Sequence, residues 1–154
     1  MAAEYDLDFH EHPEAYRYQS GEQGVFKIQP YKDELLPHWG FRDKATAETA
    51  VAALREEYNA YRSRDDFVGM DMVRKYLQMG FTRAMRYAKY PGGQKYDEDG
   101  TERTPKQWAD AEKRAAAVVF RDAWQVLTDD PAYQRLKERH QTEVYDLEAS
   151  PMEG

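Results

Sequence analysis

The chain contains no cysteine, which excludes disulfide frameworks, thiolate zinc sites, iron–sulfur clusters and thiol nucleophiles. It also lacks any apolar run that approaches the ~20 residues needed to cross a bilayer, and its mean hydropathy is -0.99. The first residues, MAAEYDLDFHEH, are acidic where a secretory signal is basic and then apolar. We therefore expect a soluble, cytoplasmic protein with no membrane partner.

Sequence motifs of catalysis and cofactor binding are missing as well. The chain has no P-loop, no G-x-G-x-x-G, no G-x-S-x-G and no H-E-x-x-H. It also has no helix-turn-helix, RNA-recognition or zinc-finger signature. We therefore assign no catalytic residue, no cofactor and no metal ligand, and an enzyme is the less favoured class of protein.

Hydrophobic periodicity predicts a mainly α chain that forms a single compact helical domain. We expect three long helices, over 45–62, from 67 or 70 to 90, and over 105–127, and a shorter C-terminal helix that starts at 131. Thr46 is the expected N-cap of the first, and Thr104-Pro105 with Gln107 forms a capping box for the third. Gly80 indicates close approach of a neighbouring helix, because a mid-helix glycine otherwise lowers stability by about 1 kcal/mol.

The N-terminal third is expected to be irregular, with at most a small hairpin near residues 24–30. Residues 1–12 are acidic and have no apolar periodicity, so we expect a flexible N-terminus. The helical domain is then expected over 13–147, and a flexible tail over 148–154.

Charge is distributed unevenly along the chain, whose formal net charge is -7. Residues 74–96 carry six basic residues and no acid, whereas residues 1–24 carry six acids and one base. Residues 129–154 carry seven acids and three bases. The cationic window contrasts with the acidic chain around it and indicates a surface that meets anionic groups.

This cationic window covers most of the second long helix and the loop after it. At about 100° per residue, Lys75, Arg86 and Lys89 lie within about 60° of one another, opposite the apolar face. The loop adds glycine amides, which can approach phosphate closely, and tyrosine rings can stack on unpaired bases. We predict a site for a polyanion, nucleic acid first, formed by Arg74, Lys75, Arg83, Arg86, Lys89, Tyr90, Gly92, Gly93, Lys95 and Tyr96.

Two other interpretations of the same residues stay open. The basic face can be an ordinary solvated surface that pairs with the chain's own acidic segments, and Asp71 with Lys75 is a routine i,i+4 helix pair. It can also bind an acidic protein or a second copy of the chain, with Tyr and Trp as anchors. A protein-interaction or self-assembly module is therefore the alternative function.

Two segments that contain histidine are further candidates. His38, Trp39 and Arg42 can line a small polar pocket, which supports a third hypothesis, an enzyme acting on a phosphorylated substrate. Such rings more often pack on the core. His10 and His12 share one side of an extended segment, but no further ligand follows at helical spacing. We therefore expect a solvated acidic segment there and no metal site.

The second long helix also carries a long motif string. Its residues 66–72 (DFVGMDM) and 74–80 (RKYLQMG) resemble a family of small microbial and phage proteins known only as a domain of unknown function. Thr82-Arg83, 86–88 and Gly92-Gly93 are similar to that family, as are the upstream segments 21–24, 30–32 and 36–39. The resemblance covers about residues 13–140. It implies one self-contained domain and no particular activity, cofactor or catalytic residue.

Overall fold

The computed structural model describes residues 7–90, 96–104 and 110–149, with the backbone alone for 145–149. Its regular structure over these ranges consists of the helices α2 (Tyr31–Leu35), α3 (Lys44–Ser63), α4 (Phe67–Lys89), α5 (Ala111–Thr128) and α6 (Pro131–Ala149), with 3-10 turns at Pro13–Ala15 and Leu36–His38. The described residues form no β strand, only isolated bridges between Asp8 and Gln29 and between Tyr96 and Glu102. The prediction of a mainly α fold with an irregular N-terminal third is confirmed.

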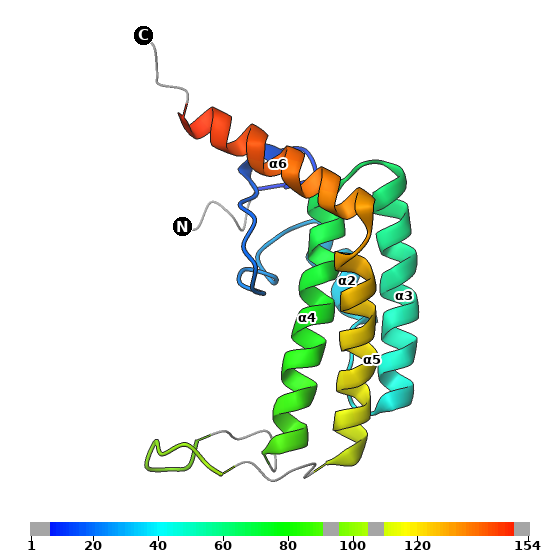
Figure 1. Cartoon of the computed structure of the whole chain (residues 1–154), viewed down its shortest axis with the longest axis vertical. Coiled ribbons are helices and arrows are strands. Elements are labelled where there is room, and N and C mark those ends of the chain that lie inside the picture. Colours follow the sequence, from blue (N-terminus) through cyan, green and yellow to red (C-terminus); the bar gives the residue numbers. More distant parts are fainter. Residues whose placement is uncertain (1–6, 91–95, 105–109, 150–154) are drawn as a thin grey trace.

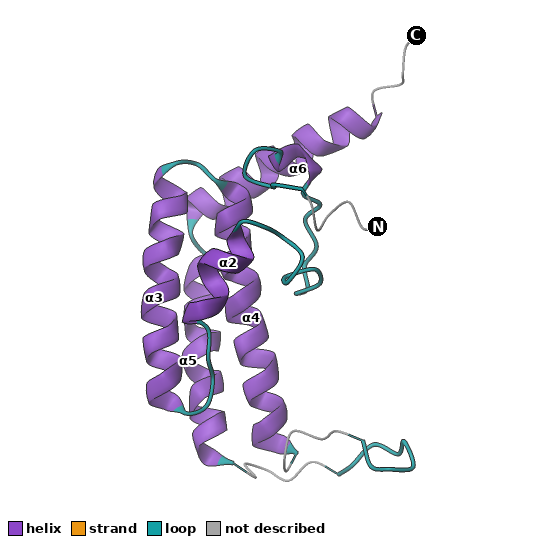
Figure 2. Cartoon of the chain, turned by 180° about the vertical axis from the view of Figure 1, so that it is seen from behind, coloured by secondary structure: helices purple, strands orange, loops and turns teal. Residues whose placement is uncertain are grey.

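The helices α3, α4 and α5 stand side by side as a three-helix bundle, and α6 crosses one end of it (Figures 1 and 2). The most extensive packing is between α4 and α5, and α3 packs on both. The N-terminal segment lies at the same end as α6, beside the first half of α4. Within the described residues, none of the helices has the length and apolar character that a membrane-spanning segment needs.

Aspartates fix where the long helices begin. The Asp43 carboxylate accepts from the Thr46 backbone N–H at 2.8 Å, and Asp66 accepts from Gly69 N–H at 3.1 Å. These bonds satisfy amides that a helix start leaves without partners. Thr46 therefore donates to the N-cap of α3 and is not the cap itself, which corrects the prediction.

The start of α5 also differs from the expected one. The helix begins at Ala111 and is capped by Asp110, whose side chain accepts from the Lys113 backbone N–H at 3.1 Å. The predicted capping box at Thr104 extends into residues 105–109, which lie outside the described residues. The C-terminal helix α6, expected to be shorter than the other three, runs over 19 residues and is one residue longer than α5, which has 18.

The ring of Phe120 on α5 packs directly against Gly80 of α4. A Cβ atom built on Gly80 would lie 2.4 Å from a ring carbon of Phe120 on α5. That distance is far below a van der Waals contact, so a side chain at this position would force the helices apart. The sequence prediction that Gly80 marks a close helix approach is confirmed.

The N-terminal segment is part of the packed structure from before residue 13. Phe9 is 4% exposed and belongs to the hydrophobic core with Tyr16, Val25 and Ile28. The backbone N–H of Phe9 donates to the carbonyl of Gln29 at 2.8 Å. The prediction that a flexible N-terminus extends to residue 12 is therefore wrong for residues 7–12, because one aromatic side chain there joins the core.

Candidate functional site

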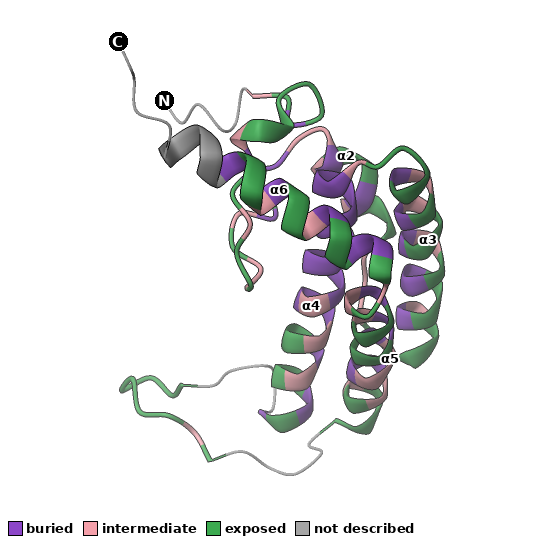
Figure 3. Cartoon of the chain, turned by 45° about the horizontal axis from the view of Figure 1, so that its top comes forward, coloured by how far each residue is buried: buried purple, intermediate pink, exposed green. Residues whose placement is uncertain are grey.

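The basic residues of α4 do not share one surface, because the helix has a buried half and an exposed half. Every residue from Phe67 to Leu77 is buried, and Figure 3 shows this half covered by its neighbours. Arg74 and Lys75 are each 2% exposed. The prediction that these two cations lie on an open basic face is wrong, because the N-terminal segment covers that side of the helix.

Asp71 is the centre of a polar cluster in the buried half. Its carboxylate is fully buried and accepts hydrogen bonds from Arg74 Nε and Nη2, both at 2.9 Å. It also accepts from the hydroxyl of Tyr133 on α6, at 2.5 Å, and from the hydroxyl of Tyr16. A buried carboxylate is tolerated only with such pairing. Asp71 thus pairs with Arg74 and not, as predicted, with Lys75.

Arg74 joins this cluster to the N-terminal segment. Its Nη1 donates to the carbonyls of Ser20, at 3.0 Å, and Gly21, at 2.7 Å, and its Nη2 donates to the carbonyl of Gln19 at 2.7 Å. Burial alone would lower the pKa of Arg74, but the Asp71 carboxylate raises it above its ordinary value. The guanidinium therefore stays charged and holds three backbone carbonyls in place.

Lys75 holds the next part of the same segment. Its Nζ donates to the carbonyl of Gln23 at 2.7 Å and lies 5.2 Å from the centroid of the Tyr16 ring. Burial lowers the pKa of Lys75 from its ordinary 10.5 to about 8, an effect that Asp71 opposes and the Arg74 charge reinforces. Both buried cations of α4 therefore anchor the segment to the helix.

A sequence signal for this burial exists. Between residues 67 and 80, apolar side chains surround α4, and the charged residues are only Asp71, Arg74 and Lys75. A helix that is apolar on all sides is buried on all sides. Periodicity alone misses this, because it assigns one face of every helix to solvent.

The exposed half of α4 carries the other helical cations of the predicted site. Arg83, Arg86 and Lys89 are exposed and follow one another at one-turn spacing. None of the three forms an ion pair with an acid in the part of the chain that the structure describes. Three positive charges are therefore available to an anionic ligand at this end of the molecule.

The structure describes the loop part of the predicted site only at its edges. Tyr90 is 8% exposed, so its ring does not offer a stacking surface, whereas Tyr96 is 55% exposed. Gly92, Gly93 and Lys95 lie outside the described residues. Their role in binding phosphate stays a prediction.

A row of aromatic rings runs beside the exposed cations. The Arg83 guanidinium lies 5.7 Å from the ring centroid of Trp39 and 6.0 Å from that of Phe26. The Trp39 ring is 5.2 Å from Phe41, whose ring is 5.8 Å from Tyr87. Phe26 and Tyr87 are each 37% exposed. We call this surface the basic–aromatic strip; it consists of Phe26, Trp39, Phe41, Arg83, Arg86, Tyr87 and Lys89.

His38, Trp39 and Arg42 do not form the polar pocket predicted from their spacing. Trp39 turns toward α4, where its Nε1–H donates to the carbonyl of Tyr76 at 3.0 Å. His38 is exposed, and the Arg42 side chain, 82% exposed, bonds only to its neighbour Asp43. Among the residues that the structure describes, no hydrogen bond or ion pair joins these three side chains to one another.

His10 and His12 face different acidic partners. His10 Nδ1 lies 3.4 Å from Asp66 Oδ2, and His12 Nδ1 lies 3.4 Å from Glu14 Oε2. Across the described residues, no three histidine, aspartate or glutamate side chains gather in a way that could hold a metal ion.

Comparison with known proteins gives one match. The model of a protein family described as Domain of unknown function (DUF4385) matches residues 1–143. No curated protein matches the chain, and no solved structure matches it. The match covers every residue of the basic–aromatic strip.

Proposed function

Because the chain belongs to the DUF4385 family, whose description assigns no activity, we propose a function from the geometry of its own residues. The chain binds a polyanion, single-stranded nucleic acid first, through the basic–aromatic strip. The observation that carries this proposal is the set of Arg83, Arg86 and Lys89, exposed on one helix end without an acidic partner in the described residues. Cations in this state neutralise phosphates and release counterions on binding.

The aromatic rings favour a single strand over a duplex. Tyr87 and Phe26 expose part of their rings next to Arg83, and bases of a single strand can stack on such rings. The Nζ atom of Lys113, on α5, lies 5.3 Å from the Tyr87 ring centroid and adds a further positive charge. Rings therefore lie beside positive charges at Arg83 and Lys113, so that bases could stack where phosphates are neutralised.

The overall acidity of the chain does not oppose this proposal. The acidic N-terminal segment and α6 lie at the end of the bundle away from the last turns of α4 (Figure 1). The acidic loop 97–102 extends beyond the bundle, and Asp97 accepts hydrogen bonds from the Asp99 and Thr101 amides of its own turn. Most of the negative charges therefore lie away from the strip. Asp110 is an acid beside the last turn of α4, because its backbone N–H donates to the Ala88 carbonyl at 3.4 Å, and its carboxylate accepts from the Lys113 amide as the N-cap of α5.

A fluorescence anisotropy titration tests the proposal. Labelled single-stranded DNA and RNA, and a duplex of equal length, are titrated at 50 and 200 mM salt. With three phosphates neutralised, we expect affinity for the single strands to fall about 20-fold between the two salt concentrations, and the duplex to bind more weakly. No binding at 50 mM salt would refute the proposal.

Matched variants locate the site. Arg86→Glu with Lys89→Glu should weaken binding at least tenfold, whereas Arg135→Glu with Arg139→Glu changes the net charge equally on exposed positions of α6 and should leave affinity nearly unchanged. Tyr87→Leu keeps an apolar contact with Phe41 and removes the stacking ring, so it should weaken single-strand binding by about tenfold. Equal losses of affinity in the two charge-reversal variants would show that binding depends on the net charge of the protein and not on the strip.

A further inference from the structure

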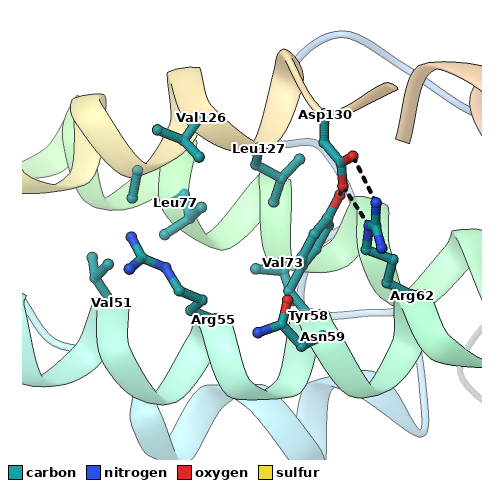
Figure 4. Close-up of a pocket in the computed structure, with 11 residues that line it drawn as sticks. Val51, Arg55, Tyr58, Asn59, Arg62, Val73, Leu77, Val126, Leu127 and Asp130 are labelled. Atoms are coloured by element: carbon teal, nitrogen blue, oxygen red, sulfur yellow. Dashed lines mark hydrogen bonds and ion pairs between the residues drawn. The ribbon is translucent and has the colours of Figure 1, made fainter. Parts of the chain in front are cut away.

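A mainly apolar groove lies between α3 and α5, over the first half of α4, and shares no residue with the basic–aromatic strip. Its volume is about 290 Å³, just below the range of about 300–1,000 Å³ that is usual for small-molecule pockets. Figure 4 shows its lining from three helices and the start of α6. The lining residues are Val51, Arg55, Tyr58, Asn59, Arg62, Val73, Leu77, Ala123, Val126, Leu127 and Asp130.

The floor and one edge of the groove are apolar. Val73 and Leu77 of α4 and Leu127 of α5 are at most 5% exposed and form the floor. Val126, on the edge, is 65% exposed, which is unusual for an aliphatic side chain next to a cavity. An apolar ligand in the groove would cover both the floor and this edge.

One end of the groove is polar, and its polar side chains already hydrogen-bond to one another. The Tyr58 hydroxyl donates to Asp130 Oδ2 at 2.6 Å, and Arg62 Nε donates to the same atom at 2.8 Å. The hydrogen bond from Arg62 keeps the pKa of Asp130 below its ordinary value. The Asp130 charge is thus balanced by Arg62 and does not repel an anion elsewhere in the groove.

Arg55 is the unbalanced charge of the groove. Its side chain extends along the opening between α3 and α5 (Figure 4). It forms no hydrogen bond or ion pair with any residue that the structure describes. On α3, the residues one turn away that line the groove, Val51, Tyr58 and Asn59, carry no acid. A positive charge thus stands uncompensated at the opening of an apolar groove.

We propose that this groove binds a small amphipathic carboxylate, with the hydrocarbon part on Val73, Leu77 and Leu127 and the carboxylate on Arg55. The apolar floor explains the need for a hydrocarbon body. The lone guanidinium, which presents paired N–H donors to a carboxylate, explains the need for one anionic head. The ligand class is therefore a medium-chain aliphatic or an aryl carboxylic acid.

Isothermal titration calorimetry with octanoate tests this assignment. Acetate, which has the carboxylate without the long chain, and 1-octanol, which has the chain without the carboxylate, are the comparison ligands. We expect saturable binding of octanoate, much weaker binding of acetate, and binding of octanol that does not depend on Arg55. Arg55→Gln should lower the affinity for octanoate at least tenfold and the affinity for octanol less than twofold. Arg135→Gln, which removes an exposed arginine from α6, is the matched control and should change neither.

A second variant tests the groove itself. Ala123→Phe places a ring where Ala123 lines the cavity and should abolish binding of both ligands, with circular dichroism confirming the helical fold. If Ala123→Phe unfolds the chain, Ala123→Met gives the same test with a flexible side chain. Octanoate binding that survives Arg55→Gln unchanged would overturn the proposal. So would sedimentation showing a stable dimer that Ala123→Phe dissociates, because the groove would then be an interface between copies.

Discussion

The two halves of α4 carry similar charge and have opposite surroundings. In the first half, Arg74 and Lys75 are buried against the N-terminal segment and bind its carbonyls. In the second half, Arg83, Arg86 and Lys89 are exposed, with aromatic rings beside them and no acid paired to them in the described chain. The comparison shows that a run of cations can change from structural anchor to available surface within three helical turns.

The cause of the difference lies outside the helix. The first half lies beside the N-terminal segment and under α6, and the second half extends past α6 and is met by the N-terminal segment only through the Phe26 ring at Arg83 (Figures 1 and 3). A buried charge requires a complete set of partners, whereas an exposed charge in water requires none. Mutations should therefore affect stability in the first half and binding in the second.

The largest effect is expected at Asp71. Asp71→Asn leaves the Arg74 guanidinium buried without its counterion, which typically lowers the free energy of unfolding by about 3–5 kcal/mol. Urea unfolding followed by circular dichroism measures the change. Asp122→Asn, at an exposed position of α5, is the control and should change stability by less than about 0.5 kcal/mol. Equal effects of the two variants would contradict the contrast between the halves.

The stability of the protein should be sensitive to side-chain volume at Gly80, which lies between the buried and exposed halves of α4. Gly80→Ala places a methyl group against Phe120, and the overpacking should lower the free energy of unfolding by about 1–3 kcal/mol, more than the gain from alanine's helix propensity. Phe120→Leu in the same chain should recover part of the loss. If Gly80→Ala stabilises the protein, the helices are not in the contact described here.

The buried amine should appear in the pH dependence of stability. The folded pKa of Lys75 is about 8, below its ordinary 10.5, so between these values the unfolded chain binds more protons and stability rises with pH. Relative to Lys75→Met, the native chain should gain about 1–2 kcal/mol between pH 8 and pH 9.5. Parallel stability profiles of the two proteins would show that Lys75 is not buried.

The smallest effect on stability is expected in the exposed half. Arg86→Gln and Lys89→Gln each remove a solvated charge without an ion-pair partner in the described chain, so the free energy of unfolding should change by less than about 0.5 kcal/mol. Thermal and urea unfolding of the double variant measure this. A loss above about 2 kcal/mol would mean that these residues are structural, and the contrast within α4 would fail.

Local features of the fold could be predicted from the sequence. The helix expected over 45–62 is α3, Lys44–Ser63. The helix expected from 67 or 70 to 90 is α4, Phe67–Lys89, so the earlier of the two starts is the one found. Helix boundaries depend on capping residues, glycines and the spacing of apolar residues, and all of these signals lie within a few residues of the boundary itself. The close packing at Gly80 could also be predicted from the local sequence, because a glycine in the middle of a helix lowers stability unless close packing requires it.

Features that depend on distant contacts could not be predicted. The burial of Arg74 depends on carbonyls at residues 19–21, more than fifty positions earlier in the chain. Phe9 joins the core through a contact with Gln29 that no local pattern indicates. Of the predicted site, Arg83, Arg86 and Lys89 stay exposed, and none of them forms an ion pair with an acid in the described chain, although the rings of Phe26 and Trp39 lie beside Arg83.

The bonds from Arg74 and Lys75 to residues 19–23 have a consequence for how this protein can vary. The acceptors are main-chain oxygens, which every amino acid supplies alike, and Gln19, Ser20 and Gln23 have exposed side chains. Exchanging these three for other residues preserves each acceptor. Deleting one residue shifts every later carbonyl by about 3.8 Å and takes it out of reach. The contact with α4 thus tolerates amino-acid substitutions in this loop but not insertions or deletions.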